Sequence, residues 1–309
     1  MTVDEQLVAF RERCPFKIYI PSKPGRYGIK LWALCDSKTY YCLNLQPYIG
    51  RVGDVLEKGQ GQRVVLYLTD FLTGSGCQIY MDNFFTSLQL ARNLLGRQMT
   101  MTGTIRRNKS ELPSEMMPSL SREKFSSVFG FQDNATIVSY VPKKNKAVIL
   151  MSTNHNEIDD STEESRKPQI IPDSNRGKCG VDTLDQLVRN YNCIRKSNRW
   201  PLTLFMNLLN ICAYNALVLF VSIHPEYEQG SGQIRKRFLL QLSKSLIGCE
   251  EENVFPPSRM PMRLVQQPSP KQKRCSFCPR ERDRKSTRRC AACQKTVCPE
   301  HVVYKCPNC

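Results

Sequence analysis

The sequence is poor in acidic residues and has no apolar leader or long uninterrupted apolar run. Its 309 residues include 28 Asp and Glu against 45 Lys and Arg, a net charge of +17. No run reaches the roughly 18 apolar residues of a membrane-spanning helix. Asp4 and Glu5 stand where a signal peptide would have its apolar region. We therefore expect no membrane association, and an acidic partner such as nucleic acid.

The cysteines are clustered at one end of the chain. Seven of the fifteen follow position 274, mostly in pairs, and the others are single and lie in apolar stretches. A secreted disulfide scaffold is not expected to distribute them in this way. Clustered pairs in a reducing compartment indicate metal binding, and scattered cysteines are typical of ordinary buried positions.

Two acidic residues stand where predicted buried strands end. Residues 79–81 predict a short strand that ends at Asp82, and the apolar spacing after Ser87 predicts a helix that ends near Gly96. Residues 28–36 predict a second strand that ends at Asp36, with residues 40–45 as its antiparallel partner. Strand ends are where α/β folds build sites, although Asp82 could also serve only to cap the following helix.

Later segments predict an insertion, two helices and a linker. Residues 109–169 are polar and loop-rich, with short strands expected at 128–140 and 147–151. Asp182 and Asp185 then share one face of a helix, since they are three residues apart. Residues 202–223 form the longest apolar helical segment, but they include three asparagines, which favours packing in a water-soluble protein. Residues 253–273 are typical of a linker.

The acids Asp36, Asp82 and Asp182 form a possible metal site. Converging carboxylates repel one another unless a cation offsets the repulsion. Hard oxygen ligands suit Mg²⁺, and two Mg²⁺ ions can promote in-line displacement at phosphorus. The alternative is that these acids are helix caps or solvated surface residues, and this alternative is stronger for Asp185.

Four ligand pairs lie in the last 35 residues of the chain. Two residues between ligands let a tight turn place both on one tetrahedral ion. We expect two structural Zn²⁺ ions, because a segment this short has too little core to fold without metal. The expected ligand sets are Cys275, Cys278, Cys298 and His301 on one ion, and Cys290, Cys293, Cys306 and Cys309 on the other. The arginines between the pairs fit DNA binding, while the cross-braced spacing also resembles a RING finger.

Basic residues near the acids are candidate phosphate contacts. Lys and Arg suffice to bind a DNA backbone without reading its sequence. A further basic group at 235–237 is as well explained as a solvated face. Trp200 could stack on a base, but packing under the following helix is the favoured interpretation. The candidate DNA-binding residues are Arg106, Arg107, Lys109, Arg195, Lys196 and Arg199.

Several longer motifs carry a family resemblance. They are residues 13–16 with 18–24 and 27–30, then 82–87, 180–186 and 195–201, in this order. The chain resembles the piggyBac transposases from about Val3 to its last residue. The resemblance implies an α/β, RNase H-like catalytic core with a catalytic triad of Asp36, Asp82 and Asp182, and with Asp185 as a further required acid. It also implies Mg²⁺-dependent strand cleavage, hairpin formation, transfer into TTAA, a homodimer and a nuclear location.

The same resemblance implies a division of the chain. Residues 14–108 and 170–191 are expected to form the catalytic core, interrupted by a β-rich insertion at 109–169. Residues 192–267 correspond to one half of a dimerisation and DNA-binding domain, and 268–309 to a zinc domain that recognises transposon ends. Residues 1–13 are expected to be a remnant of the other, upstream helical half. The alternatives are a domesticated protein that binds DNA or chromatin without cutting it, and a ubiquitin-ligase adaptor.

Overall fold

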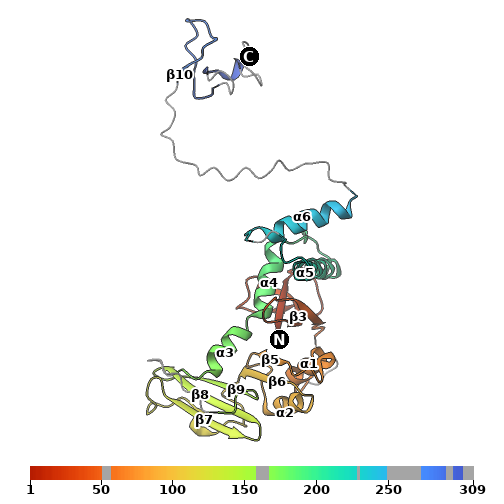
Figure 1. Ribbon diagram of the computed structural model, residues 1–309, viewed down its shortest axis with the longest axis vertical. Helices are drawn as coiled ribbons and strands as arrows, with labels where there is room; N and C mark the ends of the chain where they lie inside the picture. Colours follow the sequence, from red (N-terminus) through yellow and green to blue (C-terminus); the bar gives the residue numbers. More distant parts are fainter. Residues whose placement is uncertain (51–56, 158–166, 228–229, 249–272, 290–294, 302–309) are drawn as a thin grey trace. The chain divides into compact units, whose positions relative to one another are not determined.

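A computed structural model describes residues 1–50, 57–157, 167–227, 230–248, 273–289 and 295–301 (Figure 1). The chain divides into two compact units, Met1–Ile247 and Gly248–Cys309. The first unit is a mixed α/β structure built on one large sheet, which confirms the predicted fold class. The second unit contains the short strands β10 (Lys273–Arg274) and β11 (Lys285–Ser286).

Nine strands form the sheet of the first unit, in the order β2-β3-β1-β5-β6-β9-β8-β7, with β4 also paired to β3. Strands β1, β5 and β6 run parallel, whereas β3 is antiparallel to β1. The strands are β1 (Thr2–Ala9), β2 (Ile18–Tyr19), β3 (Tyr27–Cys35), β4 (Cys42–Pro47), β5 (Gln78–Met81), β6 (Thr100–Thr104), β7 (Ser127–Gln132), β8 (Ala135–Lys143) and β9 (Lys146–Ser152).

The first residues of the chain form a central strand, so the expectation of a helical remnant at 1–13 is wrong. Strand β1 lies between β3 and β5 and pairs with β3 along its whole length. Val3 is fully buried on one face of the sheet, and Val8 is buried on the other. The apolar residues of β1 therefore pack with residues of strands β3 and β5, which come later in the chain.

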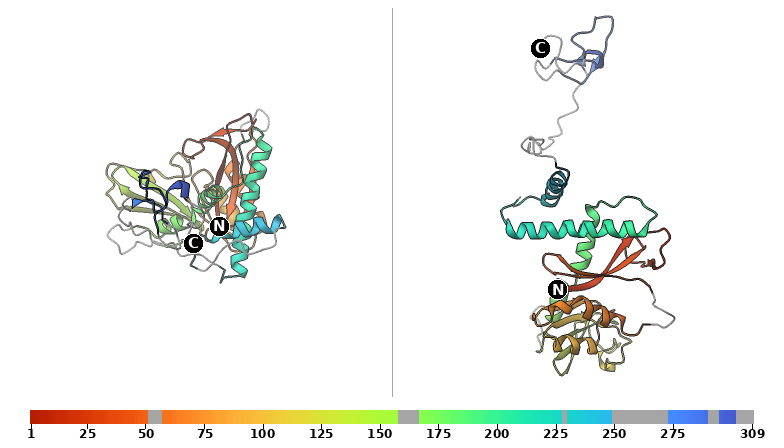
Figure 2. Two further views of the ribbon diagram at one scale, coloured as in Figure 1. Left: turned by 90° about the horizontal axis from the view of Figure 1, so that it is seen from above. Right: turned by 90° about the vertical axis from the view of Figure 1, so that its right-hand side faces the viewer.

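Helices cover both faces of the sheet around β1 (Figure 2). The apolar sides of α1 (Gln60–Leu68) and α2 (Leu88–Gly96) pack on the face that carries Val3 and Trp32. Ser87, and not Asp82, caps α2 by accepting a hydrogen bond from Leu90 N at 3.2 Å. The opposite face is covered by α4 (Gly180–Asn190) and α5 (Trp200–Ile223), while α3 (Ile170–Gly177) leads into α4 and α6 (Ile234–Leu246) packs on α5.

The strands expected within 109–169 continue the main sheet instead of forming a separate layer. Strand β9 pairs antiparallel with β6, and β8 and β7 extend the sheet beyond it. The predicted strand at 128–140 is two strands, β7 and β8, which turn at Asp133 with φ of 52°. Ile149 and Met151 join the main core, so the insertion shares that core with α1 and α2.

Helix α5 is long and apolar enough to cross a membrane by length and composition, contrary to the sequence-based expectation. Of its most apolar 18 residues, 28% are buried against the rest of the chain. Two asparagines of α5 bond to the sheet. Asn207 donates to Gln6 at 3.0 Å, and Asn215 accepts from Cys42 N at 2.9 Å and donates to Cys42 O at 2.8 Å. These bonds attach α5 to β1 and β4, as its asparagines suggested.

Candidate functional site

Asp4 and Asp82 occupy neighbouring positions along two adjacent parallel strands, β1 and β5. Thr2 pairs with Tyr80 and Val3 with Met81, and Asp4 and Asp82 come next on β1 and directly after β5. Side chains alternate along a strand, so Asp4 lies on the same face as Thr2, and Thr2 contacts the α4 side. By the same alternation Asp82 lies on the face of Tyr80, the partner of Thr2, so the two carboxylates share one face, and the charge of Asp82 contributes to the raised pKa of Asp4.

Helix α4 brings Asp182 and Asp185 to that face. Close contact between helix and sheet requires glycines: a Cβ on Gly180 would lie 2.5 Å from Thr2 Oγ1, and one on Gly177 would lie 2.2 Å from the Tyr80 ring. Gly177 is the last residue of α3, and Gly180 is the first residue of α4. Their small size lets α4 begin directly against β1, with Asp182 in the first turn of the helix.

Two side chains connect α4 to β1 at this point. Lys23 donates to Asp182 Oδ1 at 2.7 Å and to the backbone oxygen of Glu5 at 2.9 Å, and only 12% of its side chain is exposed. Gln6, two residues after Asp4, donates to Asp185 Oδ1 at 3.2 Å. Asp182 is therefore connected to the backbone of Glu5 through Lys23, and Asp185 is bound directly by Gln6.

Burial makes three of these acids, Asp4, Asp82 and Asp185, difficult to ionise. Burial, followed by the charge of Glu5, raises the pKa of Asp4 to about 8. Burial also raises the pKa of Asp82 and that of Asp185. Burial opposes the charge on Lys23, but its hydrogen bond to Asp182 and the surrounding acids outweigh this and raise its pKa. A bound cation would stabilise the ionised form of the nearby carboxylates and so oppose the effect of burial.

Asp36 does not belong to this group, so its expected place in the acid triad is wrong. Because β3 runs antiparallel to β1, its end at Cys35 lies opposite Thr2, at the start of β1. Strand β5 runs parallel to β1, so Asp82, which follows Met81, lies next to Asp4 and not at the start of β1. The carboxylate of Asp36 accepts from Thr39 N and Thr39 Oγ1, both at 2.7 Å. Asp36 stabilises a turn. The aspartate that lies beside Asp82 is Asp4, where Asp36 was expected.

The candidate phosphate-binding residues fall into two regions. Arg106 is exposed, donates to Asn83 at 3.1 Å and is close enough to lower the pKa of Asp82 in part. Arg107 is exposed and bonds Ala147 O at 2.8 Å, and Lys109 is half-buried nearby. The second region is the exposed segment between α4 and α5, which carries Arg195, Lys196 and Arg199.

Two other residues considered for DNA contact have structural roles. Trp200 packs edge-on against Phe16, with ring centroids 4.8 Å apart, as favoured from the sequence. Arg235 is 8% exposed and donates to the backbone oxygens of Leu187 and Tyr191. It connects α6 to the end of α4. Arg235 is therefore neither a phosphate contact nor a solvated surface residue.

Four of the eight predicted zinc ligands converge in the second unit. The ligand atoms of Cys275, Cys278, Cys298 and His301 all lie within 4.8 Å of one another. The sulfurs of Cys278 and Cys298 are 3.6 Å apart, and His301 Nδ1 is 3.3 Å from Cys298 Sγ. Tetrahedral Zn–S bonds place two sulfurs about 3.8 Å apart, so the cluster fits such an ion. The other four predicted ligands, Cys290, Cys293, Cys306 and Cys309, lie outside the described residues.

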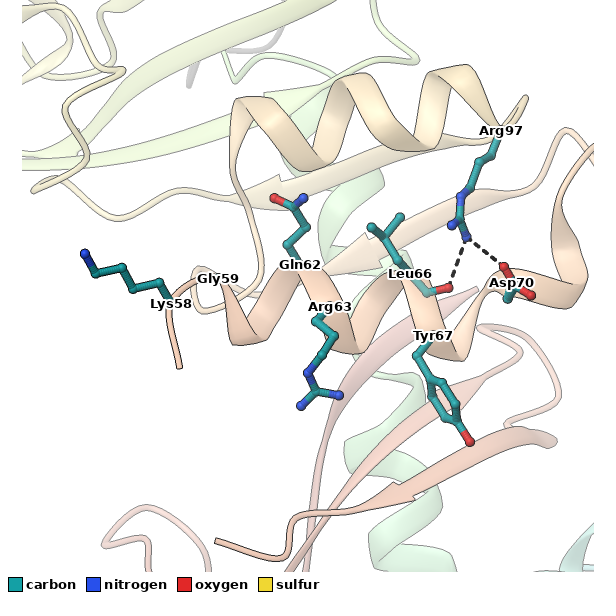
Figure 3. A pocket seen from close by; sticks show the side chains of 8 residues that line it. All are labelled: Lys58, Gly59, Gln62, Arg63, Leu66, Tyr67, Asp70 and Arg97. Atoms are coloured by element: carbon teal, nitrogen blue, oxygen red, sulfur yellow. Dashed lines mark hydrogen bonds and ion pairs between the residues drawn. The ribbon is translucent and has the colours of Figure 1, made fainter. Parts of the chain in front are cut away.

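A pocket of about 820 Å³ is lined mainly by residues of α1 and does not include Asp4, Asp82, Asp182 or Asp185 (Figure 3). Two of its three cations, Arg63 and Arg97, already have partners, and Lys58 is the third. Arg97 donates to Leu66 O and Asp70, both at 3.1 Å, and Arg63 is paired with Glu57. This pairing leaves the pocket with little free positive charge, so it is a weaker candidate for a DNA site than the acid-bearing face.

Comparison with known proteins agrees with this geometry. The Transposase IS4 family model matches residues 1–217. The human piggyBac transposable element-derived protein 3 is 24% identical over 243 residues, which is 73% of this chain and 40% of that protein. The human chimeric ERCC6-PGBD3 protein is also 24% identical, over 73% of this chain and 22% of its own length. This chain thus spans less than half the length of either relative.

The solved structures give a stronger match. A cryo-EM structure of the piggyBac transposase synaptic complex with hairpin DNA matches with a TM-score of 0.71 and 36% identity, over 100% of this chain and 69% of that chain. The fold, the family model and these matches define a DNA transposase class. The chain belongs to the Transposase IS4 family, and within it to the piggyBac transposases.

Sequence reasoning missed Asp4 but had a signal for it. Thr2-Val3 and Leu7-Val8 surround the acid with β-branched and apolar residues, a pattern that is typical of a strand. The acid lies within that strand and not at its tip. A search limited to strand ends therefore found Asp36 and Asp82 but passed over Asp4.

Proposed function

We propose that this chain carries the metal-dependent DNA cleavage and strand-transfer centre of a piggyBac-type transposase. The observation that carries the proposal is the meeting of Asp4 and Asp82 with the α4 acids on one face of the sheet. Membership of the transposase family supports it. In this proposal Asp4, Asp82 and Asp182 are the catalytic acids, and Asp185 supports them.

The donor set fits Mg²⁺, because all of its side-chain ligands are carboxylate oxygens. Two bound Mg²⁺ ions would supply Lewis-acid activation of the attacking oxygen and stabilisation of the leaving oxygen. Lys23 and Gln6 hold the α4 acids against β1, which fixes the distance between helix and strand ligands. Arg106 lies close to Asp82, where it can bind the phosphate of the strand to be cut.

DNA is the proposed partner, with transposon ends and a TTAA target as its substrates. The net charge of +17 supports binding to phosphates. The exposed cations at 106–109 and 195–199 would contact the DNA backbone. In the second unit, two structural Zn²⁺ ions would hold a module that recognises the transposon end. The reaction would take place in the nucleus, with the protein acting as a homodimer.

An assay of Mg²⁺-dependent nicking tests the proposal. Purified chain is incubated with matched transposon ends, with and without Mg²⁺, beside Asp82→Asn. We expect the wild type to nick only with metal, and the variant to bind DNA without nicking. DNA binding without nicking in the wild type would favour the domesticated, non-cutting protein. DNA binding that is absent or insensitive to salt would favour the ubiquitin-ligase adaptor.

Excision is a separate step from nicking, and it tests the expected need for a further domain. The same chain is assayed with matched ends, alone and with an added N-terminal half from a family member. We expect excision to be poor for the chain alone and to rise when the half is added. Efficient excision by the chain alone would contradict that expectation and support a self-sufficient transposase.

A further inference from the structure

A pocket of about 380 Å³ opens beside the acids. It lies between the end of β1, the loop at Lys23–Gly25, the last turns of α4 and the buried side of α5. Lys23 and Asp185 line it and also belong to the acid site described above. The volume is at the small end of the range for ligand sites. It is sufficient for one nucleotide and too small for a base pair.

One wall of the pocket is apolar and the other carries cations and amides. The apolar wall comes from β1 and from Pro24, Val188 and Ile194. Arg189 is exposed at the end of α4 and has no ion pair with a described residue, whereas Lys23 is paired with Asp182, and the carboxyl of Asp185 also lines the pocket. A nucleotide matches this lining, because its base has apolar faces and a hydrogen-bonding edge, and its phosphate is anionic.

Asn207 gives the pocket a fixed polar group. It is 3% exposed, and its Nδ2 donates to Gln6 Oε1 at 3.0 Å. Its Oδ1 has no hydrogen-bond partner among the residues that the structure describes. Gln6 in turn donates to Asp185, so a chain of two hydrogen bonds connects the pocket to the acid site. A buried amide that is oriented by one bond is well placed to recognise a ligand with its free end.

On the basis of the proposed function, we propose that this pocket receives a single unpaired nucleotide of the DNA strand beside the phosphate to be cut. The base lies on the apolar wall with its edge at Asn207, and its phosphate contacts Lys23 and Arg189. Enzymes that act on DNA commonly take a nucleotide out of the stack into such a pocket. The pocket therefore selects DNA whose strands are opened next to the cleavage site.

The test uses a single-stranded TTAA tetranucleotide with 2-aminopurine in place of one adenine, with Ca²⁺ in the buffer instead of Mg²⁺. Fluorescence titration of the full chain gives its affinity and the environment of the labelled base. The variants are Arg189→Gln and Asn207→Ala, and the matched control is Arg92→Gln, an exposed arginine on α2 that is paired with Asp133. Melting temperatures establish that each variant is folded, and Arg189→Gln removes no buried packing.

We expect Kd to rise about tenfold for Arg189→Gln and for Asn207→Ala, since each loses a hydrogen bond to the nucleotide. The control should bind like the wild type, and the matching duplex should compete poorly. Unchanged affinity in both folded variants, or equal competition by duplex, would overturn the proposal.

Asp82→Asn separates this proposal from the proposed function. It should abolish nicking, while Arg189→Gln should still weaken tetranucleotide binding when it is made in the Asp82→Asn background. If the wild type does not nick but Arg189→Gln weakens binding, the pocket stands and the transposase function fails. If Mg²⁺-dependent nicking depends on Asp82 but neither pocket variant alters binding, only the pocket proposal fails.

Discussion

Asp36 accepts two hydrogen bonds of 2.7 Å from Thr39, one from its backbone nitrogen and one from its hydroxyl. This pairing engages one carboxylate oxygen of Asp36 in a turn between β3 and β4. Asp4, which sequence reasoning overlooked, lies instead beside Asp82. The two aspartates are therefore expected to respond differently to the same substitution.

Asp4→Asn should abolish Mg²⁺-dependent nicking, because it removes a negative ligand from the proposed metal site. Asp36→Asn should keep nicking close to the wild-type rate. Gel assays of nicking on the same transposon ends measure both, and filter binding serves as the control that each variant still binds DNA. Loss of nicking in Asp36→Asn with normal activity in Asp4→Asn would restore the original triad.

The turn at Asp36 should make stability depend on acid pH. Burial opposes ionisation of Asp36, but the hydrogen bonds from Thr39 and Lys38 outweigh it and lower its pKa. Its contribution is thus present above the unfolded value, about 4, and is lost as pH falls through the lower folded pKa. Asp36→Ala should cost about 1 kcal/mol at pH 7. Urea unfolding from pH 7 to 3 should show the wild-type and Asp36→Ala curves converging at low pH; a constant gap would contradict this.

The cysteine-rich unit should bind two Zn²⁺ ions per chain. Elemental analysis of the purified full-length chain measures the content directly. Cys278→Ser and Cys290→Ser should each reduce it to one ion, because they belong to different predicted ligand sets. Cys212→Ser changes a single exposed cysteine on α5 and should leave two ions. A wild-type content of one ion would reject the second site.

DNA binding should weaken steeply with salt. Each phosphate contact adds about 0.9 to the slope of log K against log salt concentration. Lys196→Gln should reduce that slope by about one contact, since Lys196 is exposed beside the acid-bearing helix. Arg63→Gln is the matched control, because Glu57 already pairs with Arg63. Equal slopes for Lys196→Gln and wild type would remove Lys196 from the proposed DNA interface.

The outer face of α5 should promote self-association. Phe205 is 53% exposed, and Leu209, Leu219 and Ile223 are exposed at helical spacing along the same helix. Phe205→Glu should weaken association at least tenfold, because burying one large apolar side chain contributes about 1.5–3 kcal/mol. Sedimentation velocity over a range of concentrations measures this, with Leu246→Glu on α6 as the control. A wild-type chain that stays monomeric throughout would contradict the prediction.

The sequence alone determined the local elements and part of the site. Apolar spacing located α2 and α5, strand propensity located β3, β4 and β5, and ligand spacing grouped Cys275 and Cys278 with Cys298 and His301. These features depend on residues close together in the chain, or on a ligand geometry that spacing already constrains. The same reasoning placed Asp82 at a strand end and put Asp182 and Asp185 on one helix.

Only the tertiary structure decided which acids meet. Asp36 and Asp82 have the same local context, an acid after a buried strand, and differ in the direction of that strand relative to β1. Strand direction and neighbours are set by pairing between distant segments, so local propensity carries no information about them. Asp4 can be identified as a site residue only from the position of β1 between β3 and β5 and from the packing of α4 against β1 at Gly180.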